Sequence, residues 1–163
     1  MSRPFKILGV HHIAIGNADL DRLRHLWGDV LGMSLSEPFT LAAENVVGSI
    51  ARLEAGPYTV EVDLLQPLDA DKKPAPHLPP LNHVAFWVDR LSEAFEWLTG
   101  QGVRFAPGGI RAGAGGRQMA FIHPKGNDEF PLGGEGVMIE LVQAPPEVIQ
   151  AYATIQQAEL RTA

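Results

Sequence analysis

The sequence contains one pattern twice, and this duplication constrains the fold more than any other feature. Residues 10–15 form an apolar segment that carries a histidine, and residues 81–86 repeat it. Residues 62–66 form an apolar segment that carries a carboxylate, and residues 139–143 repeat it. The interval between the copies exceeds the roughly 20 to 50 residues of a solenoid unit. The sequence therefore predicts two copies of a module that contains one helix and several strands.

Apolar periodicity predicts the order β-α-β-β-β in each copy, and hence an α+β fold. In the first copy a helix follows a cap at Asn17 or Asp19 and ends at Gly32. In the second copy a helix follows a cap at Asp89 or Ser92. The predicted strands are 6–15, 46–53, 58–65, 81–88, 118–123 and 137–142, with a turn at 54–57.

These elements predict a single domain over residues 1–163, a length typical of one domain. Module one is expected at about 6–68, a proline-rich linker at 69–80 and module two at about 81–144. The segment 126–136, rich in glycine and polar residues, is expected to be a loop. An extra C-terminal helix is expected at about 146–160, after two prolines.

Composition excludes several classes of protein. There is no cysteine, so disulfides, thiolate metal sites and a cysteine nucleophile are all excluded. The net charge of −6, without a basic stripe, argues against nucleic acid as a partner. No apolar run is long enough to cross a bilayer and no signal peptide is expected, so we expect a cytoplasmic protein that does not bind membranes. Four basic residues of module two form either a solvated rim or a site for a small anionic substrate: Arg104, Arg111, Arg117 and Lys125.

The duplicated segments predict a metal site. His12 and His83 each share a strand face with an alanine two residues later, which leaves room for a cavity. Asp63 and Glu140 each lie between apolar neighbours, where an unpaired carboxylate is costly to bury. Because histidines and carboxylates occupy equivalent positions in both copies, we expect all four side chains to bind one divalent cation.

The other histidines are not expected to be ligands. His11 should point to the face opposite His12, because successive residues of a strand alternate. His25 on the first helix and His77 in the linker are expected to be solvated. Two imidazoles and two carboxylates suit Co, Ni, Mn, Zn or Fe, and the sequence does not distinguish among them.

Several segments together resemble the vicinal oxygen chelate superfamily, which contains glyoxalases, bleomycin resistance proteins and dioxygenases. They are most similar to its methylmalonyl-CoA epimerase family, over about residues 7–144. The segments that carry the resemblance are 10–15, 31–33, 82–86, 113–125 and 136–142. The resemblance implies a cupped mixed sheet formed by the two modules around a metal held by His12, Asp63, His83 and Glu140, and it implies a homodimer.

The resemblance also implies a reaction. A metal-dependent epimerase would remove the α-proton of a CoA thioester, pass through an enolate that the metal stabilises, and return the proton on the other face. Glu140 and Glu44 are the expected bases, with Glu44 offset by about one residue from the family's position. The expected substrate is an acyl-CoA or a similar anionic molecule. Asp63, where Gln or Glu is common, and the long loop 126–136 depart from the family pattern.

Three alternatives remain open at this point. An extradiol-type dioxygenase would use two histidines and one carboxylate, so a second carboxylate at Asp63 argues against it. A glyoxalase-type lyase fits the same four ligands. A metal-free small-molecule-binding module would have no reason to retain all four.

Overall fold

The computed structural model describes residues 3–52, 60–113 and 116–162. Its contacts divide the chain into two compact units, one of residues 11–85 and the other of residues 1–10 with 86–163. Strands β1 (Ile7–Gly16) and β6 (Leu81–Val88) each run from one unit into the other. Whether the chain forms the single domain expected above stays a prediction.

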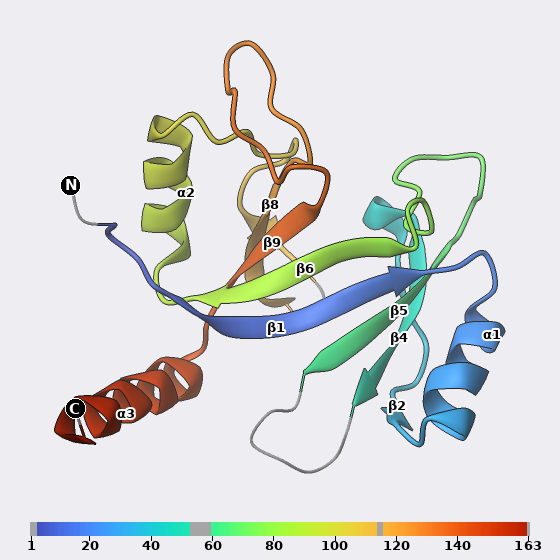
Figure 1. Cartoon of the computed structure of the whole chain (residues 1–163). Coiled ribbons are helices and arrows are strands. Elements are labelled where there is room, and N and C mark those ends of the chain that lie inside the picture. The colour runs from blue at the N-terminus through green and yellow to red at the C-terminus, as the bar shows by residue number, and fades with distance from the viewer. Residues whose placement is uncertain (1–2, 53–59, 114–115, 163) are drawn as a thin grey trace. The chain divides into compact units, whose positions relative to one another are not determined.

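The unit of residues 11–85 contains a mixed sheet (Figure 1). Its strand order is β2 (Ser34–Leu35), β4 (Val46–Arg52), β5 (Glu61–Pro67), β1 and β6, and β3 (Phe39–Leu41) pairs with β4. Strand β1 runs parallel to β5, and β4 runs antiparallel to β5. The helical segments are α1 (Leu20–Arg24), the π-helical η1 (His25–Val30) and the short 3-10 turn η2 (Ala42–Glu44). Leu20 and Leu23 of α1 pack on Leu64 of β5 to form this unit's core.

The other unit contains the end of β6, followed in the sheet by β9 (Met138–Gln143), β8 (Gln118–Ile122) and β7 (Arg111–Ala112). Helix α2 (Leu91–Gly100) packs Leu91 and Ala94 against Leu141 of β9. Helix α3 (Pro146–Thr162) follows β9, as the two prolines predicted. No helix in the described ranges is both long and apolar enough to cross a membrane.

The first turns of α1 and α2 are held by equivalent contacts in the two copies of the repeat. Asp19 caps α1 by accepting a hydrogen bond from the Arg22 N–H, and Gly32 follows the helix at φ +75°, where a side chain would be strained. The first N–H of α1, on Leu20, donates to Gln66 Oε1 at 2.7 Å. The first N–H of α2, on Leu91, donates to Gln143 Oε1 at 2.9 Å. Gln66 and Gln143 are equivalent in the repeat, so each copy ties its helix to its carboxylate-bearing strand in the same way.

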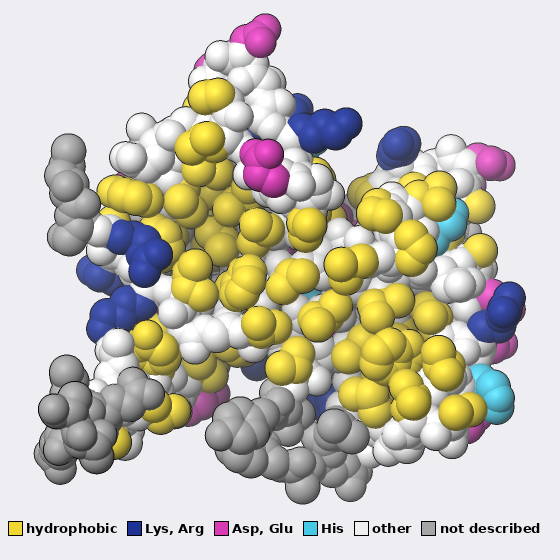
Figure 2. Space-filling view, in the orientation of Figure 1, with side chains coloured by type: hydrophobic (Ala, Val, Ile, Leu, Met, Phe, Trp, Pro, Cys, Tyr) yellow, Lys and Arg dark blue, Asp and Glu magenta, His cyan; other side chains and the backbone are white. Residues whose placement is uncertain are grey.

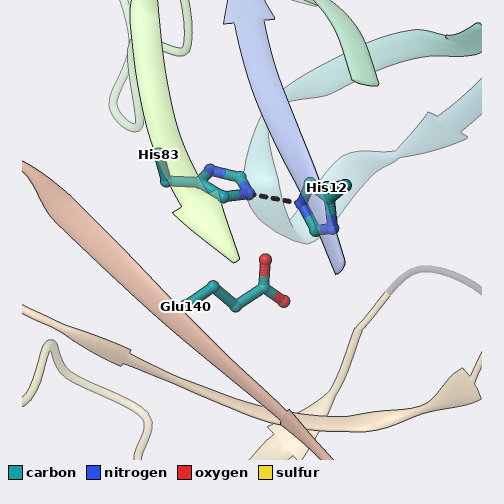
Figure 3. Close-up of side chains that lie close together, drawn as sticks. All are labelled: His12, His83 and Glu140. Atoms are coloured by element: carbon teal, nitrogen blue, oxygen red, sulfur yellow. Dashed lines mark hydrogen bonds between the residues drawn. The ribbon is translucent and has the colours of Figure 1, made fainter. Parts of the chain in front are cut away.

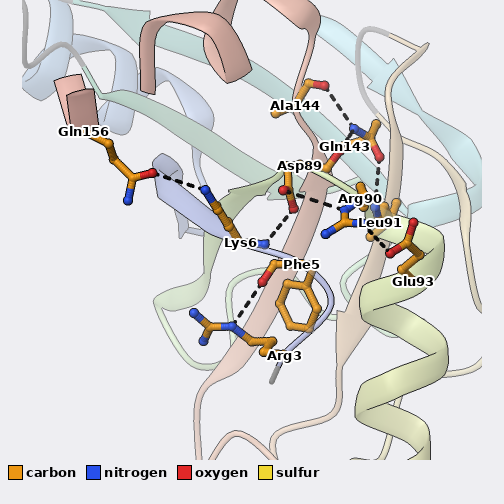
Figure 4. A network of polar contacts seen from close by, with 10 residues as sticks. All are labelled: Arg3, Phe5, Lys6, Asp89, Arg90, Leu91, Glu93, Gln143, Ala144 and Gln156. Atoms are coloured by element: carbon orange, nitrogen blue, oxygen red, sulfur yellow. Dashed lines mark hydrogen bonds and ion pairs between the residues drawn. The ribbon is translucent and has the colours of Figure 1, made fainter. Parts of the chain in front are cut away.

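The cap predicted for α2 is wrong. The N-cap is Arg90, whose side chain makes no capping bond, because Gln143 already holds the first helical N–H. Asp89 instead accepts a hydrogen bond from the Lys6 N–H at 2.6 Å, as Figure 4 shows. Local sequence suggested an aspartate cap, but contacts from distant segments decide the roles of these side chains.

The predicted strands and helices otherwise agree with the structure to within a few residues. Strand β6 has the expected bounds, and residues 123–137 contain no helix or strand, as expected of a loop. The turn expected at 54–57 lies outside the described residues. The α+β class with a mixed sheet and few helices is confirmed.

The linker is anchored rather than loose. Asn45, in the left-handed conformation at φ 54°, donates from Nδ2 to the carbonyls of Asp69 and Pro74 at 2.9 and 3.0 Å. Gly16 approaches the Pro76 carbonyl so closely that an added Cβ would lie 1.9 Å from its oxygen. On the linker surface, a hydrogen bond from Lys72 lowers the pKa of Asp69. The linker therefore has a defined path across the unit that contains both predicted histidine ligands.

Candidate metal centre

His12 and His83 lie together within the unit of residues 11–85. Both side chains are buried, with 6% and 7% of each residue exposed. Their Nε2 atoms are 2.7 Å apart and the rings meet edge to face (Figure 3). Strands β1 and β6 are neighbours in the sheet, which explains why two histidines far apart in sequence meet. The fully buried Ala14 and Ala85 share their strand faces, as the alternation predicted.

Asp63 lies on the same side of this unit. It is opposite Ala14 in the parallel pairing of β1 with β5, and it is 8% exposed. Its Oδ2 is 3.7 Å from His12 Nε2. Two imidazoles and a carboxylate, all buried, therefore gather in one unit, as the sequence predicted.

Glu140 belongs to the other unit, in the middle of β9. It pairs in register with Phe121 of β8 and is 7% exposed. Its burial agrees with the expectation that a carboxylate retained between apolar neighbours serves a purpose other than solvation.

The second predicted base, Glu44, is half-buried at the end of η2. It directly precedes Asn45, the buried residue that holds the linker. The expectation that Glu44 is a base remains a prediction, but its backbone is fixed by a turn and by an anchored neighbour.

The donor set fits a divalent cation. Two nitrogens bound to one ion at about 2.0 to 2.1 Å lie roughly 3 Å apart when the angle between them is near 90°. The 2.7 Å separation of the two Nε2 atoms is close to that value. Imidazole and carboxylate ligands without thiolate suit a first-row divalent metal.

Two expectations about the other histidines are wrong. The His11 ring is not turned away from His12, because the two Nδ1 atoms are 2.9 Å apart. His77 is half-buried and its Nδ1 is buried without a hydrogen-bond partner among the described residues, because the linker packs on Gly16. His25 is solvated as expected and pairs with Asp29 at 2.9 Å.

The basic residues of the second copy have structural contacts of their own. Arg104 donates to the Lys125 carbonyl at 3.1 Å and lies 3.3 Å from His123 Nδ1, so it helps to order the loop that follows β8. The Arg117 guanidinium, which is exposed, lies 5.6 Å from the centre of the Trp87 ring. A role for these residues in binding a substrate anion is an expectation that the contacts leave open.

Sequence analysis missed two polar residues, one beside His83 and one that holds the linker. Asn82 Oδ1 lies 2.8 Å from His83 Nδ1, and Asn45 anchors the linker. Asn82 could have been found, because it precedes the predicted ligand histidine in one copy as His11 does in the other. Asn45 carried no such signal, since its partners lie in the irregular linker.

The chain belongs to the glyoxalase/bleomycin resistance protein/dioxygenase superfamily, whose profile matches residues 11–121. The resemblance inferred from the sequence is thereby confirmed. Its relatives within this superfamily include several methylmalonyl-CoA epimerases. The mitochondrial enzyme of Mus musculus is 29% identical over 145 residues, which cover 86% of this chain and 75% of the relative. The protein YqjC of Bacillus subtilis is 30% identical over 136 residues, covering 81% and 89%.

Solved structures agree with these relatives. The crystal structure of methylmalonyl-CoA epimerase from Mycobacterium tuberculosis superposes with a TM-score of 0.73 at 27% identity, covering 92% of this chain and 97% of that one. A methylmalonyl-CoA epimerase in complex with methylmalonyl-CoA and NH4+ shares the fold, with a TM-score of 0.72 at 21% identity and coverage of 86% and 97%.

Proposed function

We propose that this protein epimerises methylmalonyl-CoA or a similar 2-substituted acyl-CoA thioester, with a divalent metal held by His12, Asp63, His83 and Glu140. The single observation that carries the proposal is the buried pair of imidazoles with facing Nε2 atoms, in a chain whose relatives are methylmalonyl-CoA epimerases. The burial of Asp63 and Glu140 supports their assignment as the remaining ligands.

The reaction needs a group that takes a proton from carbon and a group that gives one back on the opposite face. A hydrogen next to a thioester carbonyl is only weakly acidic, so the negative charge that develops on the carbonyl oxygen must be stabilised. A bound divalent cation would supply this stabilisation as a Lewis acid. The residues of the chain bind and orient the thioester and move the proton.

Glu44 and Glu140 are the proposed bases. A carboxylate that accepts the α-proton on one face becomes a neutral acid, while the opposite group, already protonated, delivers a proton to the other face. Glu44 is suited to this role because it is half-buried and is the last residue of the short turn η2, which fixes its backbone. Glu140 is buried in the middle of β9, where it is shielded from bulk water.

The anionic substrate also needs positive charge. The exposed Arg117 and the Lys125 side chain are the proposed contacts for its carboxylate or phosphates, because Arg104 is already engaged with loop carbonyls. Electrostatic attraction of this kind acts mainly on the rate of association and weakens with salt.

Conversion of one pure epimer of methylmalonyl-CoA into the other, followed by chromatographic separation of the two epimers, tests the proposal. Metal-loaded protein is expected to bring either epimer to the same equilibrium mixture. No interconversion by folded, metal-loaded protein would contradict the proposal. Parallel measurements of oxygen uptake with catechols and of glutathione-thiohemiacetal isomerisation would then identify a dioxygenase or a lyase.

A homodimer in the cytoplasm is the proposed state of the protein. Large apolar side chains are exposed in both units, among them Val30, Leu78 and Leu132, and Figure 2 shows that hydrophobic side chains are frequent on the visible face. Exposed apolar surface of this kind is typical of interaction sites. Sedimentation velocity should give the mass of two chains, and a monomer over the whole micromolar range would contradict the assignment.

A further inference from the structure

We propose that the residue preceding each ligand histidine, Asn82 before His83 and His11 before His12, is a positioning residue that holds Nδ1 of that histidine by a hydrogen bond, so that Nε2 faces the metal. This rests on the proposed function for the metal, although part of its test does not need metal. The two positions are equivalent in the repeat, and all four residues lie in the unit of residues 11–85.

The orientation of the Asn82 amide is fixed by the linker. Its Nδ2 is 2.9 Å from the Pro76 carbonyl oxygen, which can only accept a hydrogen bond. The amide oxygen must therefore face His83 Nδ1, at 2.8 Å. Because an amide oxygen can only accept, the proton of neutral His83 is on Nδ1. The lone pair is then on Nε2, the atom that faces His12.

Asn82 thus prepares His83 for a metal before any metal is bound. A ligand imidazole needs its other nitrogen protonated and held by an acceptor, which fixes both the tautomer and the ring orientation. The anchored linker holds the acceptor of the Asn82 amide in place, because Pro76 packs against Gly16, where no side chain would fit. Metal binding at His83 requires no proton to move.

His11 must behave differently. When both buried imidazoles are neutral, the proton between the two Nε2 atoms belongs to His12, because His83 Nε2 has none. His12 Nδ1 then accepts a proton donated by His11 Nδ1 at 2.9 Å. Metal binding at His12 Nε2 moves that proton to Nδ1, so His11 has to change from donor to acceptor. An imidazole can do so by exchanging tautomers, with no proton gained or lost by the pair.

The experiment compares Asn82→Ala with Asn82→Asp. Both variants lose the donor to Pro76, but only Asp keeps an acceptor for His83 Nδ1. If Asn82 sets the tautomer, Asn82→Ala should weaken zinc binding by roughly 10- to 100-fold, whereas Asn82→Asp should bind at least as tightly as the native protein. If Asn82 only holds the linker, the two variants would be impaired equally, and that result would overturn the proposal.

Two-bond ¹H–¹⁵N correlation spectra of metal-free protein provide the second measurement. Neutral His83 should carry its proton on Nδ1 in the native protein and in Asn82→Asp, and should become a mixture of tautomers in Asn82→Ala. An unchanged tautomer in Asn82→Ala would contradict the proposal even if no metal bound at all. Absence of zinc binding by native protein with the expected tautomers would instead contradict the proposed function alone.

For the first copy, His11→Asn and His11→Ala form the matched pair. Asn reproduces the arrangement at Asn82, and its amide can rotate to accept, so zinc affinity should be retained. Ala offers no partner and should weaken binding by a similar 10- to 100-fold. Equal affinity of all three proteins would exclude His11 as a positioning residue. His25→Ala, at an exposed histidine, is the control.

Discussion

A buried imidazole needs a partner for each ring nitrogen, and His83 has both within hydrogen-bond distance. His83→Ala removes one proposed ligand and leaves a small cavity beside Ala85. We expect the variant to stay folded and to lose stoichiometric metal, measured by elemental analysis after dialysis. His25→Ala should keep its metal. Full occupancy of His83→Ala would show that the assigned ligand set is wrong.

Glu44 tests the assignment of two bases. Removing one base of a pair should separate exchange of the α-proton with solvent from inversion at the α-carbon. In Glu44→Gln the amide cannot take a proton, so epimerisation should fall by roughly 10²- to 10⁴-fold. The epimer whose α-proton faces the remaining base should still exchange that proton with solvent, and the other epimer should not. In deuterated buffer, the mass of the substrate reports exchange of the α-proton, and the configuration of its α-carbon reports inversion.

Metal content is the control for this variant, and it should match that of the native protein. Native rates of epimerisation in Glu44→Gln would mean that Glu44 is a structural residue at the end of η2 and that another group is the second base.

Single residues show what the sequence could indicate and what it could not. His12, His83, Asp63 and Glu140 were chosen from their equivalence in the repeat, and all four are buried, while their role as ligands stays a prediction. The ring of His11 could not be placed, because strand alternation fixes the direction of Cβ but not the rotation of an imidazole. The burial of His77 depends on how the linker packs on Gly16, which no local pattern encodes.

At the scale of elements, the paired glutamines hold each helix to its carboxylate-bearing strand. Gln143 accepts from Leu91 and donates to the carbonyls of Asp89 and Ala144 (Figure 4). Gln143→Leu leaves these groups without their partner, so the free energy of unfolding should fall by about 1 to 3 kcal/mol. Gln66→Leu should act in the same direction through Leu20.

Urea denaturation in the presence of a chelator measures these changes without a contribution from metal. The exposed Gln157 on α3 is the control, and Gln157→Leu should change stability by less than about 0.5 kcal/mol. If Gln143→Leu were as stable as that control, the glutamine would not be what holds α2 to its strand.

Long elements were predictable and short ones were not. Strand β6 has eight residues, mostly apolar, and its bounds are those expected from the sequence. Strands β2, β3 and β7 have two or three residues, too few for any periodicity to be visible, so they depend on pairing with longer neighbours. The cap of α2 was missed for the same reason, because Gln143 reaches it from a distant strand.

For the whole molecule, bound metal should contribute to stability. A ligand that binds only the folded state stabilises it by about 2.7 kcal/mol when its free concentration is 100 times its Kd. Thermal unfolding should therefore shift upward with added zinc or cobalt in the native protein and not in His83→Ala. Equal shifts in both proteins would indicate metal binding elsewhere.

The duplication predicted the α+β class and the order of the longer elements, because those depend on patterns that recur along the chain. The superfamily followed from the resemblance of several segments. The anchored linker and the tautomers at the histidines come from contacts between segments far apart in sequence. Asn45, for example, holds carbonyls of Asp69 and Pro74, and neither pairing has a local signal.

The central claim is that these histidines and carboxylates hold a metal for the exchange of an α-proton. Incorporation of deuterium into methylmalonyl-CoA in heavy water, followed by mass spectrometry, measures that exchange directly. Native protein with metal should incorporate one deuterium at the α-carbon, and the rate should collapse on chelation and in His83→Ala. Exchange that persists undiminished in metal-free protein, or that is absent from metal-loaded protein, would contradict the claim.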